Sequence, residues 1–509
     1  TTTGNALRIT GTTVAAAGFK VRTLNQNGGT NGILLDTTGN TGGTIVVSGT
    51  GSAGTGGTIQ NTSGDAISLN NAHNASFSWM NITNAASGVS NIANCDLDTA
   101  SGCESGVDLT GASSNITIDR FVIDHNDGGQ IGISGNAVNN LTITNTQILE
   151  VGNANEESGI LLVDPQGVVT ITDVTVDDPA EYGIRVYKLA NTTLNLKLTR
   201  VLVQNNLAKT FGEAGFSIRA DGGTSYVLVD DSDFLNTDGP GVDGQAINAA
   251  VLHMTVQNTV FTENRALPFA VNFTTDNTSQ GFAKITGNTI TDCVTPADCS
   301  IALDFDANRT SSLHAIVANN TINGSGIGSA MEFIVGDGAT GRAEVRDNNV
   351  TVNGGELGMT FHARSEGFGG SNGRLDVIYE GNTVNGVSSG GLFNPGIQFL
   401  AGSSTGTHDQ DVCVNTSTLN GAGGNTINGT NSPGLTPRFE VTQRTGTSFF
   451  LQGFTGTGTN QASVAAHFDS NNNAGTLDPT FVRPAGGTAI VNYAAGACNA
   501  PTTPTLPTP

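Results

Sequence analysis

The chain is poor in charged and aromatic side chains. Asp, Glu, Lys and Arg make up 12% of its 509 residues, aromatic residues make up 6%, and tryptophan occurs once. In an ordinary globular domain about a quarter of the residues are charged. This scarcity excludes a charged coiled coil, whose helices pair through charged flanking positions. The hydrophobic fraction of 37%, with 69 glycines besides, also excludes an intrinsically disordered composition.

Basic residues and long apolar runs are scarce as well. There are 20 Lys and Arg against 43 Asp and Glu, which gives a net charge of −23. We therefore expect no nucleic-acid partner, because phosphate backbones are bound by basic surfaces. No run approaches the roughly 20 apolar residues that cross a bilayer, so we expect no membrane insertion of this segment. The first residue is Thr1 and no leader-like segment opens the chain, so we expect an export signal to have been removed.

Six cysteines follow one another as three pairs. In chain order they are Cys95 and Cys103, Cys293 and Cys299, and Cys413 and Cys498. None has the CxxC spacing of a zinc or redox site. The simplest pairing closes the two short loops and joins Cys498 to Cys413, and buried or free thiols are the alternative. Disulfides predict an extracellular location, since they persist in oxidising compartments.

Short apolar-x-apolar blocks recur along the chain, and two of their positions repeat the same residue type. One ladder consists of Phe273, Phe305, Phe333, Phe361 and Phe399, at steps of 32, 28, 28 and 38 residues. The other consists of Asn288, Asn320, Asn348 and Asn382, each two residues before Ile or Val. Alternation over such short blocks predicts strands that are too short to be stable alone. A sandwich of antiparallel hairpins would give no reason for like residues to recur in this way.

Together these ladders predict an all-β solenoid, a single-stranded parallel β-helix of about twelve turns. Each strand would pair in parallel with its equivalent one turn on, so that identical side chains stack. We expect the phenylalanines to fill the interior and the asparagines to mark a turn, because Asn tolerates left-handed backbone angles. We read one elongated domain with four segments. They are irregular N-terminal coils over 1–60, the β-helix over 61–430, a C-terminal capping subdomain over 431–498 and a Pro/Thr-rich linker over 499–509.

The repeats also resemble a known superfamily. The motifs LTITNTQI, ITGNTI, VANNTI and VRDNNV, with glycine-led strands such as SGILLV, resemble the right-handed parallel β-helix proteins of the pectate-lyase-like superfamily. The segments GTTVAAAGFKVRTLNQNGGTNGILLD, GGTIQNTSGDAISLNNA and RFEVTQ…SFFLQGFTGTG are similar to long secreted or surface-displayed bacterial proteins of this fold. The resemblance implies a right-handed coil. It does not fix function, because the superfamily includes lyases, hydrolases, tailspikes, adhesins and autotransporter passengers.

One motif matches a catalytic element of that superfamily. Asn236-Thr237-Asp238-Gly239 has the NTDG pattern of polygalacturonase-like hydrolases. That family also needs a following Asp pair, Gly-His-Gly and Arg-x-Lys, and none of these appears downstream. We therefore interpret NTDG as a turn.

A column of polar residues on the Phe-bearing strands gives the weak catalytic candidates Asp304, Glu332, His362 and Arg364. The column itself contains Asn272, Asp304, Glu332, Thr360 and Gln398, and Asp306, His362 and Arg364 project on the same side. Two carboxyls on adjacent turns, about 5 Å apart, could serve a retaining glycosidase. Weak Ca²⁺ binding is a second interpretation. The simplest one is a solvated face without a catalytic or metal site, and we otherwise expect no cofactor.

From these features we expect a structural or adhesive rod at the cell surface. Its partners would be further copies of itself, in arrays or filaments, or a cell-surface glycan. The alternative is a polysaccharide-degrading enzyme, a glycoside hydrolase or lyase, or a tailspike-like depolymerase. For the tail PTTPTLPTP two placements stay open: against a neighbouring copy, or held on its own coil by a Cys413–Cys498 bridge.

Overall fold

The computed structural model describes most of the chain, in twenty segments. They are residues 4–39, 42–85, 104–128, 131–152, 157–206, 213–262, 269–292, 301–325, 329–353, 357–364, 372–385, 396–402, 410–416, 424–428, 439–444, 446–456, 461–472, 482–483, 493–494 and 498–508. The cysteines at 95, 103, 293 and 299 lie outside these residues, so their predicted pairing stays a prediction.

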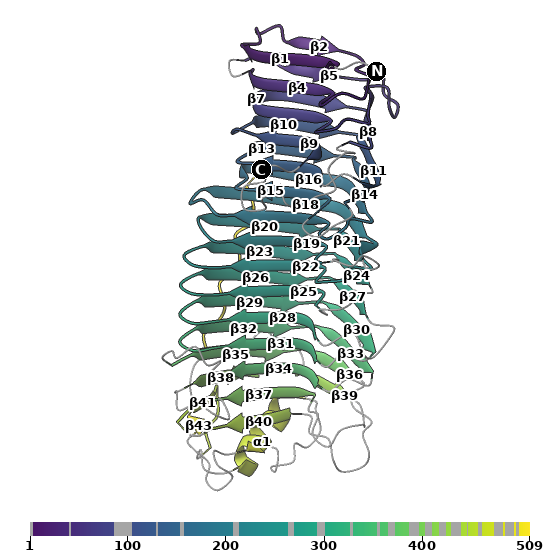
Figure 1. Cartoon of the computed structure of the whole chain (residues 1–509). Helices are drawn as coiled ribbons and strands as arrows, with labels where there is room; N and C mark the ends of the chain where they lie inside the picture. Colours follow the sequence, from purple (N-terminus) through teal and green to yellow (C-terminus); the bar gives the residue numbers. More distant parts are fainter. Residues whose placement is uncertain are drawn as a thin grey trace. The chain divides into compact units, whose positions relative to one another are not determined.

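The chain forms a right-handed parallel β-helix, as predicted (Figure 1). It divides into two compact units, residues 1–243 with 506–509 and residues 244–505. In each unit one turn contributes strands to three faces, and every strand pairs in parallel with the strand one turn on. Strand β22 (Val242–Ala246) contains the division. The antiparallel sandwich is therefore excluded.

The first unit has three faces. Its face 1 contains β1 (Leu7–Thr12), β4 (Ile33–Thr38), the start of β7 (Ile67–Ser78), β9 (Ser105–Thr110), β12 (Ile131–Asn136), β15 (Ile160–Val163), β17 (Ile184–Lys188) and β19 (Phe216–Ala220). Its face 2 contains β2 (Phe19–Val21), β5 (Ile45–Val47), the end of β7, β10 (Ser114–Asp119), β13 (Asn139–Thr144), the first parts of β16 (Gln166–Asp177) and β18 (Thr193–Gln204), and β20 (Thr224–Asp230). Its face 3 contains β3 (Gln26–Asn27), β6 (Gly57–Gln60), β8 (Met80–Thr83), β11 (Val122–Gly128), β14 (Gln147–Val151), the ends of β16 and β18, and β21 (Asp233–Leu235).

The second unit repeats the three faces. Its face 1 contains β25 (Val271–Thr275), β28 (Ile301–Ala307), β31 (Ser329–Val335), β34 (Leu357–Ala363), β37 (Ile397–Ala401), β40 (Phe439–Gln443) and β42 (Val482–Arg483). Its face 2 contains β23 (Val251–Gln257), β26 (Gln280–Thr286), β29 (Ser312–Ala318), β32 (Thr340–Arg346), β35 (Arg374–Glu380), β38 (Asp411–Asn415), β41 (Ser448–Leu451) and β43 (Tyr493–Ala494). Its face 3 contains β24 (Val260–Thr262), β27 (Thr289–Asp292), β30 (Thr321–Ser325), β33 (Asn349–Asn353), β36 (Thr383–Asn385) and β39 (Thr426–Asn428).

The predicted phenylalanine ladder is a buried stack in the second unit. Phe273, Phe305, Phe333, Phe361 and Phe399 are fully buried and occupy equivalent positions on successive face 1 strands. The rings of Phe305 and Phe333 stack with centroids 4.7 Å apart, and those of Phe361 and Phe399 at 5.3 Å. The parallel register places like rings one strand spacing apart, close to the separation that offset stacking prefers.

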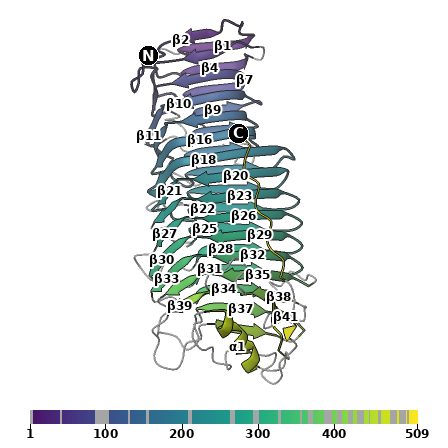
Figure 2. The same cartoon turned by 180° about the vertical axis from the view of Figure 1, so that it is seen from behind.

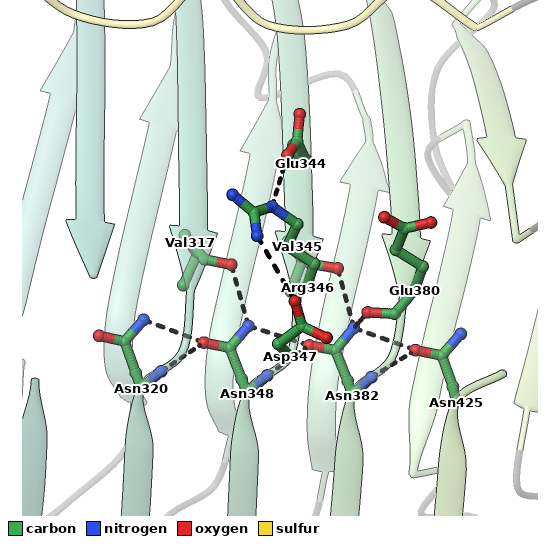
Figure 3. Close-up of polar contacts among 10 residues, drawn as sticks. All are labelled: Val317, Asn320, Glu344, Val345, Arg346, Asp347, Asn348, Glu380, Asn382 and Asn425. Atoms are coloured by element: carbon green, nitrogen blue, oxygen red, sulfur yellow. Dashed lines mark hydrogen bonds and ion pairs between the residues drawn. The ribbon is translucent and has the colours of Figure 1, made fainter. Parts of the chain in front are cut away.

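The asparagine ladder is a continuous hydrogen-bonded column at the corner that leads into face 3 (Figure 3). Asn348 donates from its Nδ2 to Oδ1 of Asn382 at 2.9 Å and to the carbonyl of Val317 at 2.9 Å, and its backbone N–H bonds the same Asn382 oxygen at 3.1 Å. Asn320 makes the equivalent bonds to Asn348. The ladder extends one turn further than predicted, because Asn382 bonds Asn425 in the same way.

The expectation that these asparagines adopt left-handed backbone angles is wrong. The positive φ angles occur one residue earlier, at Gly287, Asn319, Asp347 and Gly381. The preceding residue turns the chain, which leaves each ladder side chain free to point inward, where it is almost fully buried. Buried amides of this kind need partners for all their polar groups, and the next turn supplies them.

Glycine is required where face 3 turns back into face 1. A Cβ at Gly159 would lie 2.4 Å from Cγ1 of Val176 and 2.6 Å from the carbonyl oxygen of Gly183. Gly183 meets the same restriction against Val203. Strands β15, β17 and β19 therefore each begin directly after a glycine, because the corner there is too tightly packed for a side chain.

Beyond the regular turns of the second unit lies the helix α1 (Gln461–Asn471). Its Phe468 is buried and packs on Phe439 and Phe399, with ring centroids 5.2 and 6.0 Å away. Asn472 accepts from Asn425, so it ends the ladder. Parallel pairing begins already at β1 and reaches β42, so it extends beyond both ends of the segment 61–430. No helix among the described residues is long and apolar enough to cross a membrane.

The predicted bridge between Cys413 and Cys498 is present, with Cα atoms 5.4 Å apart. The residue after it, Asn499, donates from Nδ2 to Asp376 at 2.6 Å. Of the two placements considered for the tail, the structure shows the one held on its own coil.

Candidate functional site

The predicted polar column lies on the outer side of face 1 in the second unit. Asn272, Asp304, Glu332, Thr360 and Gln398 occupy equivalent positions on successive strands, and Glu440 continues the column. Asp306 and His362 share the adjacent column, and Arg364 directly follows β34. The four candidate residues Asp304, Glu332, His362 and Arg364 therefore lie in one region of face 1.

Asp304 is the most perturbed group of this site. Its side chain is buried and, among the described residues, its Oδ1 has no hydrogen-bond partner. Burial, together with the charges of Asp306 and Glu332, raises the pKa of Asp304 to about 8, although the Arg364 charge opposes this shift. The carboxyl is consequently protonated at neutral pH.

His362 lies between Glu332 and the amide of Gln398. Its Nε2 is 2.7 Å from Oε1 of Gln398, whose own Nε2 donates to Glu440 at 3.2 Å. Since the Gln398 oxygen must accept, the histidine proton is on Nε2 and the bare Nδ1 lies 3.9 Å from Glu332. Burial lowers the pKa of His362 to about 4, and the Arg364 charge adds to this although the Gln398 bond opposes it. A neutral ring makes no ion pair with Glu332.

This arrangement offers one proton donor rather than an open catalytic centre. A carboxyl that keeps its proton at neutral pH can act as a general acid, and Glu332 lies one strand away from it. Against this, the reactive atoms of Asp304 and His362 are buried. No group of three or more His, Cys, Asp or Glu side chains in the described part of the chain could hold a metal ion.

A second acidic cluster, in the first unit, was missed by the sequence analysis. Burial raises the pKa of Asp108 to about 7 and raises those of Asp65 and Glu104 as well. Ser134 donates to Asp108 at 2.8 Å, and the backbone N–H of Ser105 donates to Asp65 at 2.9 Å. This cluster has neither a His nor an Arg among these partners, so the raised carboxyl pKa values arise here from burial and from the charges of neighbouring carboxyls. The same cause accounts for Asp304.

The NTDG element is a corner, as interpreted. Asn236 has a φ of 55°, in the left-handed region. The hydroxyl of Thr237 donates to the carbonyl of Gly239 at 3.0 Å, and the N–H of Asp238 donates to Oδ1 of Asn206. These groups bond within the corner and to the preceding turn of the coil.

A third feature is a regular set of uncharged, outward side chains on face 3 of the second unit. Its strands alternate buried Ile or Val with outward Thr or Asn, in the order N-T-I-T, N-T-I-N, N-N-V-T, N-T-V-N and N-T-I. We call this surface the Thr/Asn face, and it consists of Thr289, Thr291, Thr321, Asn323, Asn349, Thr351, Thr383, Asn385 and Thr426. The sequence already shows two outward Thr or Asn residues, separated by Ile or Val, directly after each ladder asparagine. Only the strand register shows that these residues form two columns.

In comparisons with known proteins, no family model, no curated protein and no solved structure matches the chain.

Proposed function

We propose that the chain is a structural and adhesive β-helix of an extracellular surface, and that its Thr/Asn face binds neutral, hydroxyl-rich glycans. The observation that carries the proposal is the regular, uncharged array on face 3 of a chain whose net charge is −23. The disulfide between Cys413 and Cys498 supports the extracellular location. Self-association into arrays stays a prediction.

The chemistry of the Thr/Asn face suits a glycan. A threonine hydroxyl and an asparagine amide each donate and accept hydrogen bonds, as sugar hydroxyls do. The array repeats about every 4.8 Å between turns and about every 6.6 Å along a strand, so many weak bonds can form at once. Because none of the nine residues of the Thr/Asn face is charged, a neutral glycan can contact them without removing water from a charged group.

The array is also held rigidly from beneath. Each first-column residue directly follows a buried ladder residue, as Thr321 follows Asn320 and Thr383 follows Asn382. The residue between the two columns, such as Ile322 or Val384, is fully buried. A surface that is ordered before binding loses little conformational entropy on binding.

The test compares retention of the chain on immobilised polysaccharides: a neutral β-glucan, a mannan and a galactan, and acidic polygalacturonate. We expect retention on one or more neutral polymers. The variant Thr321→Lys with Thr383→Lys should bind about tenfold more weakly, a loss of about 1.4 kcal/mol. The matched control, Thr172→Lys with Thr199→Lys, alters outward threonines on face 2 of the first unit and should bind as the parent does. Retention only on polygalacturonate, or equal loss in both variants, would contradict the proposal.

The second candidate is a polysaccharide-degrading enzyme at Asp304 and Glu332. It is favoured by the protonated state of Asp304, which fits a general acid. We place it second because the unpartnered oxygen is buried and because the cluster around Asp108 shows the same shift without other catalytic groups.

A further inference from the structure

One outward column on face 2 of the second unit carries rings and charges instead of threonine. It contains His253, Phe282, His314, Arg342 and Asp376, one on each successive strand from β23 to β35. We call these five residues the ring track. The rings of His253 and Phe282 stack with centroids 4.5 Å apart, and His314 meets Phe282 edge-on at 5.1 Å. Cys413 continues the same column, so the disulfide to Cys498 begins at the end of the track.

The C-terminal residues lie along this track as an extended segment (Figure 2). The sequence repeats Pro-Thr three times with a period of three, at Pro501-Thr502, Pro504-Thr505 and Pro507-Thr508. The N–H of Thr502 donates to Nδ1 of His314 at 3.1 Å, and the N–H of Thr505 donates to Nδ1 of His253 at 3.2 Å. Successive contacts are thus three residues apart along the tail and two turns apart along the coil.

That ratio matches the geometry of a polyproline II helix. Three residues of polyproline II rise about 9.3 Å, and two strand spacings of a parallel sheet measure about 9.4 to 9.8 Å. In a Pro-Thr-x repeat, the threonine N–H of each successive repeat therefore lies beside the same column of the coil, two turns further on. Prolines have no N–H to leave unpaired, and Pro504, between the two bonded threonines, is buried.

The acceptors are suited to this role. Burial lowers the pKa of His314 to about 4, with a contribution from Arg342, and burial also lowers the pKa of His253. A neutral imidazole has one ring nitrogen without a proton, and in each ring Nδ1 accepts the threonine N–H.

The first unit provides a contact of the same kind. The N–H of Thr508 donates to Oδ1 of Asn195 at 3.0 Å, and Pro507 is buried. Asn195 pairs in register with an aromatic residue, Tyr226. An amide oxygen can thus replace the histidine nitrogen as the acceptor for the threonine N–H.

We infer that the ring track is a binding site for a polyproline II strand of Pro-Thr-x repeats, one repeat for every two turns. Its resident ligand is the chain's own segment 499–505, tethered by the Cys413–Cys498 bridge. This inference is independent of the proposed function, since it concerns another face and another ligand.

The first test measures amide hydrogen exchange in the full chain with single-residue resolution. Thr502, Thr505 and Thr508 should exchange at least about tenfold more slowly than Thr503 and Leu506. His314→Phe keeps a ring but removes the acceptor, so it should abolish the protection of Thr502. His314→Asn should restore it, as Asn195 does for Thr508. Uniform exchange along the tail, or protection that survives His314→Phe, would overturn the inference.

The second test separates recognition from tethering. In a full chain carrying Pro501→Gly, Pro504→Gly and Pro507→Gly, the tail loses its polyproline II preference and leaves the track open. A fluorescent peptide of residues 499–509 should then bind saturably by anisotropy, and a peptide of the same composition without the three-residue period should not. No binding, or equal binding of both peptides, would show that the bridge alone holds the tail.

Discussion

At the scale of single residues, the asparagine ladder makes the clearest prediction. Asn348→Ala removes the partner of two donors on Asn320 and leaves the carbonyl of Val317 without its bond. Each buried group without a partner costs about 1–3 kcal/mol. We therefore expect the free energy of unfolding to fall by about 3 kcal/mol or more in chemical denaturation. The neighbouring Asn349→Ala, on the exposed face, is the matched control and should cost less than about 1 kcal/mol; equal effects would mean that the ladder is not buried.

The ladder also shows what a sequence can reveal about single residues. The recurrence of Asn288, Asn320, Asn348 and Asn382 predicted that they stack, because parallel register brings like residues together. It did not reveal which residue turns the backbone, since Asn is common both at turns and in buried ladders. The Gly, Asn or Asp directly before each one carried that information.

The acidic column makes a prediction about pH. The pKa of Asp304 is about 8 in the folded chain against an ordinary value of 3.8, so the folded state holds a proton that the unfolded state releases. Its contribution to stability is complete below about pH 3.8 and is lost as the pH rises toward 8. Asp304→Asn, which cannot ionise, should match the parent near pH 4 and exceed its unfolding midpoint at pH 8.5.

Asp173→Asn is the control for this pH series. Its hydrogen bond with Arg200 lowers the pKa of Asp173, which is an exposed carboxyl, so this variant should gain no stability at high pH. If Asp304→Asn gave no gain that grows with pH, the buried, protonated state of Asp304 would be wrong.

At the scale of elements, the phenylalanine stack is the main internal support of the second unit. Phe333→Ala should lower the free energy of unfolding by about 3–5 kcal/mol, because it leaves a cavity between the rings of Phe305 and Phe361. Phe450→Ala is the matched control: this ring faces outward, with Arg374 5.4 Å from its centroid, and should cost much less. A loss for Phe333→Ala no larger than the control would contradict the register.

The sequence predicted the strands well and the ends less well. Apolar alternation and the recurrence of Phe and Asn identified the repeating blocks, because each turn of the coil packs against equivalent residues of the turns beside it. The strands between 7 and 60 lacked a regular period, yet β1 already pairs with β4 in parallel. Helix α1 was not predicted, because its apolar residues, such as Val464 and Phe468, pack on the end of one coil instead of repeating along it.

At the scale of the whole molecule, three outward surfaces of the second unit, the acidic column, the Thr/Asn face and the ring track, differ in chemistry although the same coil supports them. The candidate acids were predicted correctly as neighbours, because their spacing follows the phenylalanine ladder. Their burial and shifted pKa values could not be predicted, since these depend on packing across turns. The ring track could not be predicted either, because Thr502 and His314 are 188 residues apart in the sequence.

We propose that the chain binds glycans without cleaving them. The most direct measurement incubates the intact chain with the neutral polysaccharides and with polygalacturonate, and analyses the soluble products by mass spectrometry. We predict retention without products, and unchanged retention for the variant Asp304→Ala with Glu332→Ala. Cleavage products that the parent forms and this variant does not, with the circular dichroism of the two unchanged, would contradict the account.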